Sequence, residues 1–301
     1  MANPILAFSA TRRMRSLRTL IVVLAYVSVL LLIAAVLLRG MFGRAVSLYT
    51  MQRSVTCYAV LLVVQFLMLI LIGPAMASGA IAGERERQTL ELLLVTNTRS
   101  FRIAVGKVME SFALLALLIV CGLPVMCLTM VAGGVTLVQI LVGMLFLLAV
   151  AFGTVSVGIF SSACTRSTLL STVMSYVLIG MIGLVTALPM VFGYPARITD
   201  AVYDSSKYAS MTSGQALGMI SPLLMANPGY GLTALLEGQT SALSNYLTYR
   251  EHGRLLCTYM LMTKAGCQTV ALVSSGIIAA AGCALTALSA LLIRPMKKHG
   301  K

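Results

Sequence analysis

Residues 55–82 read VTCYAVLLVVQFLMLILIGPAMASGAIA, a run of apolar and small side chains without a charged residue. A membrane hydrocarbon core of about 30 Å requires about 20 predominantly apolar residues in a helix, and this run exceeds that length. Inside a bilayer every backbone N–H and C=O must be paired, which a helix achieves within its own segment. The run is therefore interpreted as a membrane-spanning helix, and it decides the fold class.

Five other runs of the chain share this length and this near absence of charge. The sequence thus predicts an all-α integral membrane protein with six transmembrane helices in a single domain. The first run follows several arginines and resembles a signal peptide, but it is long and lacks a small-residue cleavage site, so it is interpreted as a retained span. Within residues 1–301, the predicted spans are 20–38, 55–82, 103–131, 135–163, 169–192 and 265–293.

The composition excludes a water-soluble domain. Of the 301 residues, 59% are hydrophobic and only 10% are charged, whereas soluble domains carry about 25% charged residues. The 22 basic and 8 acidic residues give a net charge of +14, but charges this sparse among apolar runs indicate a lipid bilayer rather than nucleic acid. The 7 cysteines are an odd number and lie mostly in apolar runs, so no disulfide framework is expected.

The distribution of Lys and Arg predicts that both chain termini are cytoplasmic, because basic residues near span ends are retained on that side. The long segment 193–264 is then extracellular, while Arg39, Arg44 and Arg53 fall in a short outer loop and count against this orientation. Residues 1–19 combine arginines with apolar side chains, which predicts either an amphipathic helix on the inner leaflet or a simple topogenic charge cluster. The expected location is a prokaryotic inner or plasma membrane, crossed several times.

The predicted spans carry no ionisable side chain at mid-depth, which disfavours an ion-driven transporter. Lys107 and Glu110 enter an apolar run only near its cytoplasmic end, where they can pair with each other. The chain has only 2 histidines and lacks zinc-binding, nucleophile-elbow and phosphate-loop motifs. We therefore expect no catalytic residue, metal, cofactor or ATP site in this chain.

Small residues recur at four-residue spacing in two of the predicted spans. Such stripes let helices approach closely in lipid, and both are interpreted as ordinary packing faces. The first stripe is Thr154, Gly158 and Ser162, and the second is Ser275, Ala279, Cys283 and Ala287.

One predicted cytoplasmic stretch is first charged and then apolar. Residues 81–97 read IAGERERQTLELLLVTN, in which three leucines recur at helical spacing. Glu84 and Glu86 suit the positive N-terminal end of a helix dipole, and Asn97 can end the helix in a left-handed turn. A short amphipathic helix between the second and third spans is therefore predicted. This helix either transmits movement from a cytoplasmic partner to the two adjoining spans or lies at the membrane interface without a partner.

The order of residues in this region resembles the permease subunits of the ABC-2 family of ATP-binding-cassette transporters. Pro74 in the second span is followed by ERER at 84–87, by TLELLL at 89–94 and by Gly106-Lys107. The opening Asn3-Pro4-Ile5-Leu6 and the topology of six spans are also similar to that family. The resemblance is concentrated between Pro74 and Lys107.

The resemblance implies that the loop after the second span is a coupling helix that docks on a separate ATPase subunit, with the N-terminal amphipathic helix beside it. The loop at 164–168 would be a second, shorter coupling element. The chain departs from the family at Gln88, where glycine is frequent, and in the length of segment 193–264. The residues that the resemblance assigns to ATPase coupling are Glu84, Arg85, Glu86, Arg87, Thr89, Leu90, Glu91 and Arg166.

The expected function is that of the transmembrane permease subunit of an ATP-binding-cassette exporter, which forms the substrate path and is no enzyme itself. Its expected partners are a separate ATP-binding-cassette ATPase chain, a second permease copy or homologous permease, and the lipid bilayer, without nucleic acid. The alternative is a membrane-embedded scaffold or sensor subunit that moves no substrate.

Overall fold

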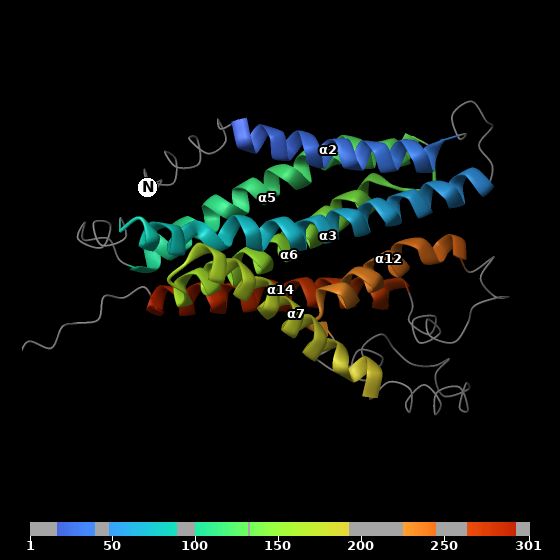
Figure 1. The fold of residues 1–301 in the computed structure, drawn as a ribbon. Helices are drawn as coiled ribbons and strands as arrows, with labels where there is room; N and C mark the ends of the chain where they lie inside the picture. Colours follow the sequence, from blue (N-terminus) through green and yellow to red (C-terminus); the bar gives the residue numbers. More distant parts are fainter. Residues whose placement is uncertain are drawn as a thin grey trace, which may run out of the picture.

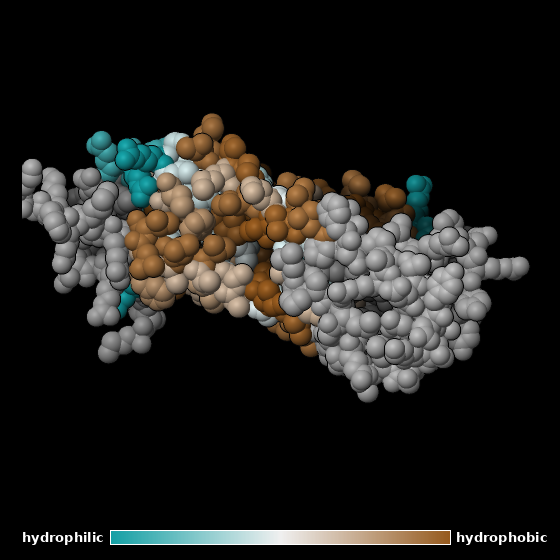
Figure 2. Space-filling model, turned by 90° about the horizontal axis from the view of Figure 1, so that it is seen from below, coloured by the Kyte–Doolittle hydropathy of each residue, from teal (hydrophilic) through white to brown (hydrophobic). Residues whose placement is uncertain are grey.

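The computed structural model describes residues 17–39, 48–88, 100–131, 133–192, 225–244 and 264–292. Within these residues the chain forms helices and no strand, and six helices are long and apolar enough to cross a membrane. Figure 2 shows one face of the molecule, where hydrophobic residues cover the middle and hydrophilic residues gather toward the ends. The predicted all-α class and the multi-pass membrane architecture are therefore confirmed.

The six candidate spans form a bundle with a seventh helix packed among them (Figure 1). Each span lies close to its predicted position, and the largest difference is that the helix containing 55–82 is longer at both ends. Residues 1–16 of the predicted N-terminal amphipathic helix lie outside the described residues. The helices are α2 (Leu17–Leu38), α3 (Leu48–Glu86), α5 (Ser100–Val131), α6 (Leu137–Cys164), α7 (Thr168–Phe192), α12 (Pro228–Ser244) and α14 (Lys264–Leu292).

Helices α3 and α6 pack against each other at the centre of the bundle. A Cβ atom added at Gly158 would lie 2.6 Å from the Cβ of Ala77 and 3.5 Å from the Cα of Pro74. A Cβ added at Gly73 would lie 2.6 Å from Oγ1 of Thr154. Such close approach is the main source of helix association in lipid, where burial of apolar surface supplies no drive. The first predicted small-residue stripe is thus confirmed as a packing face, with α3 as its partner.

The second predicted stripe behaves differently. Cys283 and Ala287 are exposed, so within one chain their interpretation as a packing face is wrong. Helix α14 instead approaches α6 through Gly282, where an added Cβ would lie 2.8 Å from the ring of Phe152. Spacing alone identifies the stripe but does not say which side of the helix faces the bundle, because α14 carries small residues on more than one side.

Helix α12 comes from segment 193–264, which the sequence predicted to be extracellular, with residues 216–236 apolar enough for the membrane interface and no fold assigned. It packs mainly against α14 and also contacts α3 and α6. Near its end, Gln239 Nε2 donates to the carbonyl of Gln139 (3.1 Å), and Gln139 Nε2 donates to the carbonyl of Gln239 (3.0 Å). Apart from Lys264, which begins α14, the rest of segment 193–264 lies outside the described residues. Residues 225–244 are thus part of the bundle itself.

The start of α12 lies deep between the spans. Asn227 Nδ2 donates to the carbonyl of Gly183 (3.1 Å), which belongs to the candidate span Thr168–Leu188 of α7. Asn227 is also the residue before the helix, and Oδ1 accepts hydrogen bonds from the N–H groups of Gly229 (2.8 Å) and Tyr230 (3.4 Å). Pro228 suits the first helical position because it has no N–H to leave unpaired. Asn227 and Pro228 therefore begin α12 with its first N–H groups either absent or bonded within the chain.

Arg53, near the start of α3, bonds to the end of α2. Its Nε donates to the carbonyl of Leu37 at 3.0 Å, one residue before the end of α2. The last carbonyls of a helix lack partners within the helix, so a cation there is favourable. This contact gives Arg53 a local role that does not depend on the side of the membrane.

Helix α3 continues past the predicted span as far as Glu86. The prediction that residues 81–97 begin a separate helix is therefore wrong for 81–86, which form the last turns of α3. Glu84 and Glu86 accordingly lie at the negative C-terminal end of a helix dipole rather than at its positive end. Glu and Arg are strong helix formers, so the helix does not stop where the apolar run stops. Thr89, Leu90 and Glu91 lie outside the described residues.

The chain leaves α3 through a left-handed residue. Gln88 has φ 56°, and its N–H bonds to the carbonyl of Arg85 at 3.1 Å. Glycine adopts this conformation without the steric penalty that a Cβ brings. Glycine would therefore suit position 88 better than glutamine does.

Replacing Gln88 by glycine should therefore stabilise the end of α3. We expect Gln88→Gly to raise the free energy of unfolding by about 0.5–1 kcal/mol, measured as an increased Tm of the detergent-solubilised chain. Gln88→Ala is the control, because it keeps the Cβ and should give no increase. Equal melting temperatures for the two variants would show that position 88 is not left-handed in solution.

Candidate functional site

Three consecutive side chains at the end of α3 each bond to a different neighbouring helix. Residues of a helix project about 100° apart, so Glu84, Arg85 and Glu86 point in three directions. Their partners belong to α5, to the end of α6 and to the start of α7, which meet at one end of the bundle (Figure 1). We call these three residues, together with Lys107 and residues 163–168, the charged junction.

Glu84 connects α3 to α5. Its Oε1 lies 2.6 Å from Nζ of Lys107, and the two side chains are 22% and 23% exposed. Lys107 Nζ also lies 3.8 Å from Oε2 of Glu110, so the predicted pairing within α5 is confirmed as the longer of two ion pairs. Largely buried pairs are screened less by water and salt than exposed ones. The shorter pair, which joins two helices, was not predicted.

Arg85 caps the end of α6. Its Nη1 donates to the carbonyl of Thr165 at 2.8 Å and to the carbonyl of Ala163 at 3.3 Å. Both oxygens belong to the last turn of α6 or to the residue that follows it, where helix carbonyls have no partner within the helix. The positive guanidinium also suits the negative end of the α6 dipole.

Glu86 caps the start of α7. Its Oε1 accepts a hydrogen bond from the N–H of Thr168 at 2.8 Å, and its Oε2 lies 3.1 Å from Oγ1 of the same residue. Thr168 is the first residue of α7, and its N–H would otherwise be one of the unpaired donors of a helix start. A carboxylate is favourable at this positive end of the α7 dipole. Arg85 and Glu86 thus match the dipoles of the two helices that they join to α3.

Hydroxyl groups extend the junction one to two turns into the bundle. Ser78 Oγ of α3 lies 2.8 Å from Oγ1 of Thr172 in α7, and Ser171 Oγ donates to the carbonyl of Ser78 at 2.8 Å. Ser161 Oγ of α6 bonds to Oγ of Ser175. Hydroxyls are effective at joining membrane helices because lipid offers them no alternative partner. The ends of α3, α6 and α7 are therefore fastened by both charges and hydroxyls.

A further hydroxyl holds the backbone of α3 directly. Ser162 Oγ of α6 accepts hydrogen bonds from the N–H groups of Ile81 (3.0 Å) and Ala82 (2.8 Å). Both N–H groups lie within α3, two to three residues before Glu84. The side chain of Ser162 and the charged side chains therefore act on the same turn of α3.

The residues that the ABC-2 resemblance assigns to ATPase coupling fall into three groups: those bonded within the chain, those exposed, and those outside the described residues. Glu84, Arg85 and Glu86 bond within the chain, whereas the side chains of Arg87 and Arg166 are exposed at the same end of the bundle. Thr89, Leu90 and Glu91 lie outside the described residues. The sequence identified the charged residues but not their partners, because Thr165 and Thr168 are about eighty positions away and carry no charge.

The part of the chain that the structure describes contains no group of three or more His, Cys, Asp or Glu residues able to hold a metal ion. Lys107 lies between the carboxylates of Glu84 and Glu110, and Arg85 bonds to the carbonyls of Thr165 and Ala163, so these charges are paired within the chain, whereas Arg166 is exposed. These contacts hold α3 against α5 and against the end of α6.

No family model matches this chain, and comparison with curated proteins finds no relative.

Proposed function

We propose that this chain is the permease subunit of an ATP-binding-cassette exporter, with both termini and the charged junction on the cytoplasmic side of a cell membrane. The observation that carries the proposal is the junction itself. Glu84, Arg85 and Glu86 bond α3 to α5, to the end of α6 and to the start of α7. We therefore expect a movement of the α6–α7 turn to be transmitted to α3 and α5, as a subunit driven by a cytoplasmic partner would use.

The exposed residues around the junction supply a surface for the ATPase subunit. Arg87 and Arg166 present positive charge there, and they flank the internally bonded residues on the α3 and α7 sides. In the proposal, Thr89, Leu90 and Glu91 also take part in ATPase coupling, as the sequence resemblance implies, and the ATP site is on the partner chain. Glu84, Arg85 and Glu86 act as positioning residues that carry the movement inward.

A second permease copy completes the substrate path. Helices α2 and α7 are the least buried of the candidate spans, and their exposed faces are apolar. In the proposal one of these faces packs against the second copy and lipid covers the rest. Movement of the fastened helix ends then changes the contact between the two copies and opens the path outward.

A charge swap tests the role of the junction. In a complex purified with its ATPase, Glu84→Lys should lower ATP hydrolysis about tenfold, because it places two cations together in a largely buried site and about 1.4 kcal/mol suffices for that factor. The double variant Glu84→Lys with Lys107→Glu, made in a Glu110→Gln background so that residue 107 does not face a second carboxylate, restores an opposite-charge pair and should recover most of the activity. Arg87→Glu is a matched control at an exposed position, and it should weaken binding of the ATPase instead.

Two results would count against the proposal. If the double variant is as inactive as the single one, Glu84 acts outside the junction. If the tagged chain retains no subunit with an ATP-binding cassette in mild detergent, the permease role itself fails. The scaffold or sensor alternative predicts a retained ATPase whose activity does not respond to candidate substrates in reconstituted vesicles.

A further inference from the structure

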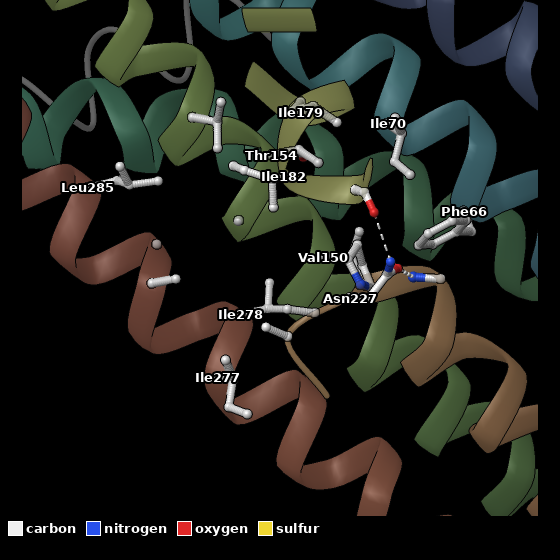
Figure 3. Close-up of a pocket in the computed structure, with 18 residues that line it drawn as sticks. Phe66, Ile70, Val150, Thr154, Ile179, Ile182, Asn227, Ile277, Ile278 and Leu285 are labelled. Atoms are coloured by element: carbon white, nitrogen blue, oxygen red, sulfur yellow. Dashed lines mark hydrogen bonds between the residues drawn. The ribbon is translucent and has the colours of Figure 1, made fainter. Parts of the chain in front are cut away.

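A cavity of about 340 Å³ lies between α3, α6, α7 and α14, beside the first residues of α12. Figure 3 shows Ile182 of α7, Ile278 of α14 and Phe66 of α3 on different sides of this space, with Asn227 at one end of it. Small-molecule sites in proteins have volumes of about 300–1,000 Å³, so the cavity is large enough to hold a ligand.

The cavity lies near the middle of the candidate spans. Ile70, Val150 and Ile179 line it and are close to the centres of the spans Arg53–Glu86, Leu137–Cys164 and Thr168–Leu188. The surroundings of the bundle at this depth are hydrocarbon rather than water. A ligand that enters sideways therefore comes from the lipid phase.

The polar groups around the cavity are paired within the chain. Pro228 has no N–H, and the N–H groups of Gly229 and Tyr230 bond to Oδ1 of Asn227. The N–H of Gly231 bonds to the carbonyl of Asn227 at 3.1 Å. The start of α12 thus has its N–H groups occupied, which disfavours an anion at this helix end.

The hydroxyl of Thr154, which lines the cavity, is also hydrogen-bonded within the chain. Thr154 Oγ1 donates to the carbonyl of Ala151 at 3.0 Å, within α6. A buried water needs two to four polar partners, and apolar cavities without them stay dry. The lining therefore selects for a ligand without hydrogen-bonding groups at this depth.

The cavity has an entrance between α7 and α14. Ile182 is 42% exposed and Ala281 is also exposed, although both line the cavity. Val157 and Val150 on the opposite wall are buried, at 7% and 1% exposure. The space is thus closed toward α6 and open toward the lipid side.

We propose that this cavity binds an alkyl chain, inserted from the bilayer between α7 and α14. An aliphatic and aromatic lining gains dispersion contacts from an alkyl chain and loses them when the space is empty. A dry cavity of about 150 Å³ with a similar lining already accepts benzene. The chain belongs either to a membrane phospholipid or to a free amphiphile. This binding site does not depend on the permease role.

Fluorescence quenching tests the site in the full-length chain, which contains 0 tryptophans. A tryptophan introduced at Ile179 reports on the cavity, and one introduced at Val177 reports on lipid at a similar depth, because Val177 is 53% exposed and does not line the cavity. The probe is a fatty acid brominated near the end of its chain, titrated into phosphatidylcholine vesicles that contain each variant. We expect saturable quenching for Ile179→Trp, at about tenfold lower probe concentration than the non-saturable quenching for Val177→Trp.

Filling the cavity should abolish the saturable part. Val157→Phe places a ring into the space because Val157 is buried against its closed wall, and Leu285→Phe does so from α14 if the first variant fails to fold. Leu184→Phe adds the same bulk on the lipid side, where Leu184 is 67% exposed, and should leave quenching unchanged. Equal, non-saturable quenching at positions 179 and 177, with no effect of Val157→Phe, would overturn the proposal.

A second arm identifies the source of the chain. The same variants are placed in vesicles of phosphatidylcholine that is itself brominated at mid-chain. If adding Val157→Phe to Ile179→Trp reduces the quenching in these vesicles without any fatty acid, the alkyl chain belongs to a phospholipid. Quenching that depends on Val157 only with the added fatty acid assigns it to a free amphiphile. Either result supports an alkyl-chain site.

Discussion

Gly158→Val is expected to prevent α3 and α6 from packing and to abolish the folded bundle. Even the first carbon of the new side chain would lie 2.6 Å from the Cβ of Ala77, closer than real Cβ atoms approach. The Cα and carbonyl oxygen of Pro74 would be in van der Waals contact with this carbon at 3.5 Å, so the backbone of α3 leaves no space beside it for the further methyl groups. Overpacking usually costs about 1–3 kcal/mol, and two further methyl groups at the centre of the bundle should exceed that range.

The measurement is the fraction of monodisperse protein on size-exclusion chromatography after membrane extraction, together with its Tm. Gly180→Val is the matched control, because nothing lies within 4 Å of a Cβ at Gly180, on the exposed side of α7. We expect the control to behave as the native chain does. If both variants fold equally well, the close approach of α3 and α6 is wrong.

Arg85→Leu is expected to release the turn between α6 and α7 from α3. The variant keeps bulk at position 85 but removes both hydrogen bonds to the carbonyls of Thr165 and Ala163. Hydrogen bonds of charged groups contribute about 1.5–3 kcal/mol each, so losing both bonds should weaken the link between Arg85 and this turn by about a hundredfold or more. In the proposed function, ATP hydrolysis by the assembled complex would then no longer depend on transport substrate.

Hydrogen exchange of the isolated chain measures the release without any assumption about function. The N–H groups of Thr165 and Thr168 are bonded at this turn, and we expect them to exchange at least about tenfold faster in Arg85→Leu. Arg85→Lys should give an intermediate result, because one ammonium preserves the charge near the α6 end but not the planar fork. Arg166→Leu changes an exposed arginine in the same turn and should leave the exchange rates unaltered. Faster exchange in both leucine variants would mean that the turn responds to charge rather than to the hydrogen bonds of Arg85.

The spans could be predicted because hydropathy is a local property. The run at 55–82 contains all the information needed to place a helix in a membrane, and α3 indeed contains it. Its ends could not be predicted as well, because Glu84 and Glu86 are charged and yet continue the helix. Their helix propensity permits this, and what the local sequence does not show is their bonding to Lys107 and Thr168, which are distant in sequence.

Helix α12 could not be predicted for a related reason. Its first residues, Asn-Pro-Gly-Tyr-Gly at 227–231, are typical of a loop exposed to water. Only the hydrogen bonds of Asn227 make them suitable for the interior of the bundle. The alkyl-chain site was missed together with α12, since four spans and the start of α12 all contribute to its wall.

The contacts of α12 determine which helices can move as one unit. It lies along α14, whereas the contact from Asn227 to α7 is a single hydrogen bond to Gly183. Parting α7 from the α12–α14 pair would break this bond without unfolding a helix, but it would leave Asn227 Nδ2 and the carbonyl of Gly183 unpaired in apolar surroundings, at a cost of about 1–3 kcal/mol each. The apolar cavity lies between α7 and α14. An alkyl chain in it would therefore contact both helices and either hold them together or keep them apart.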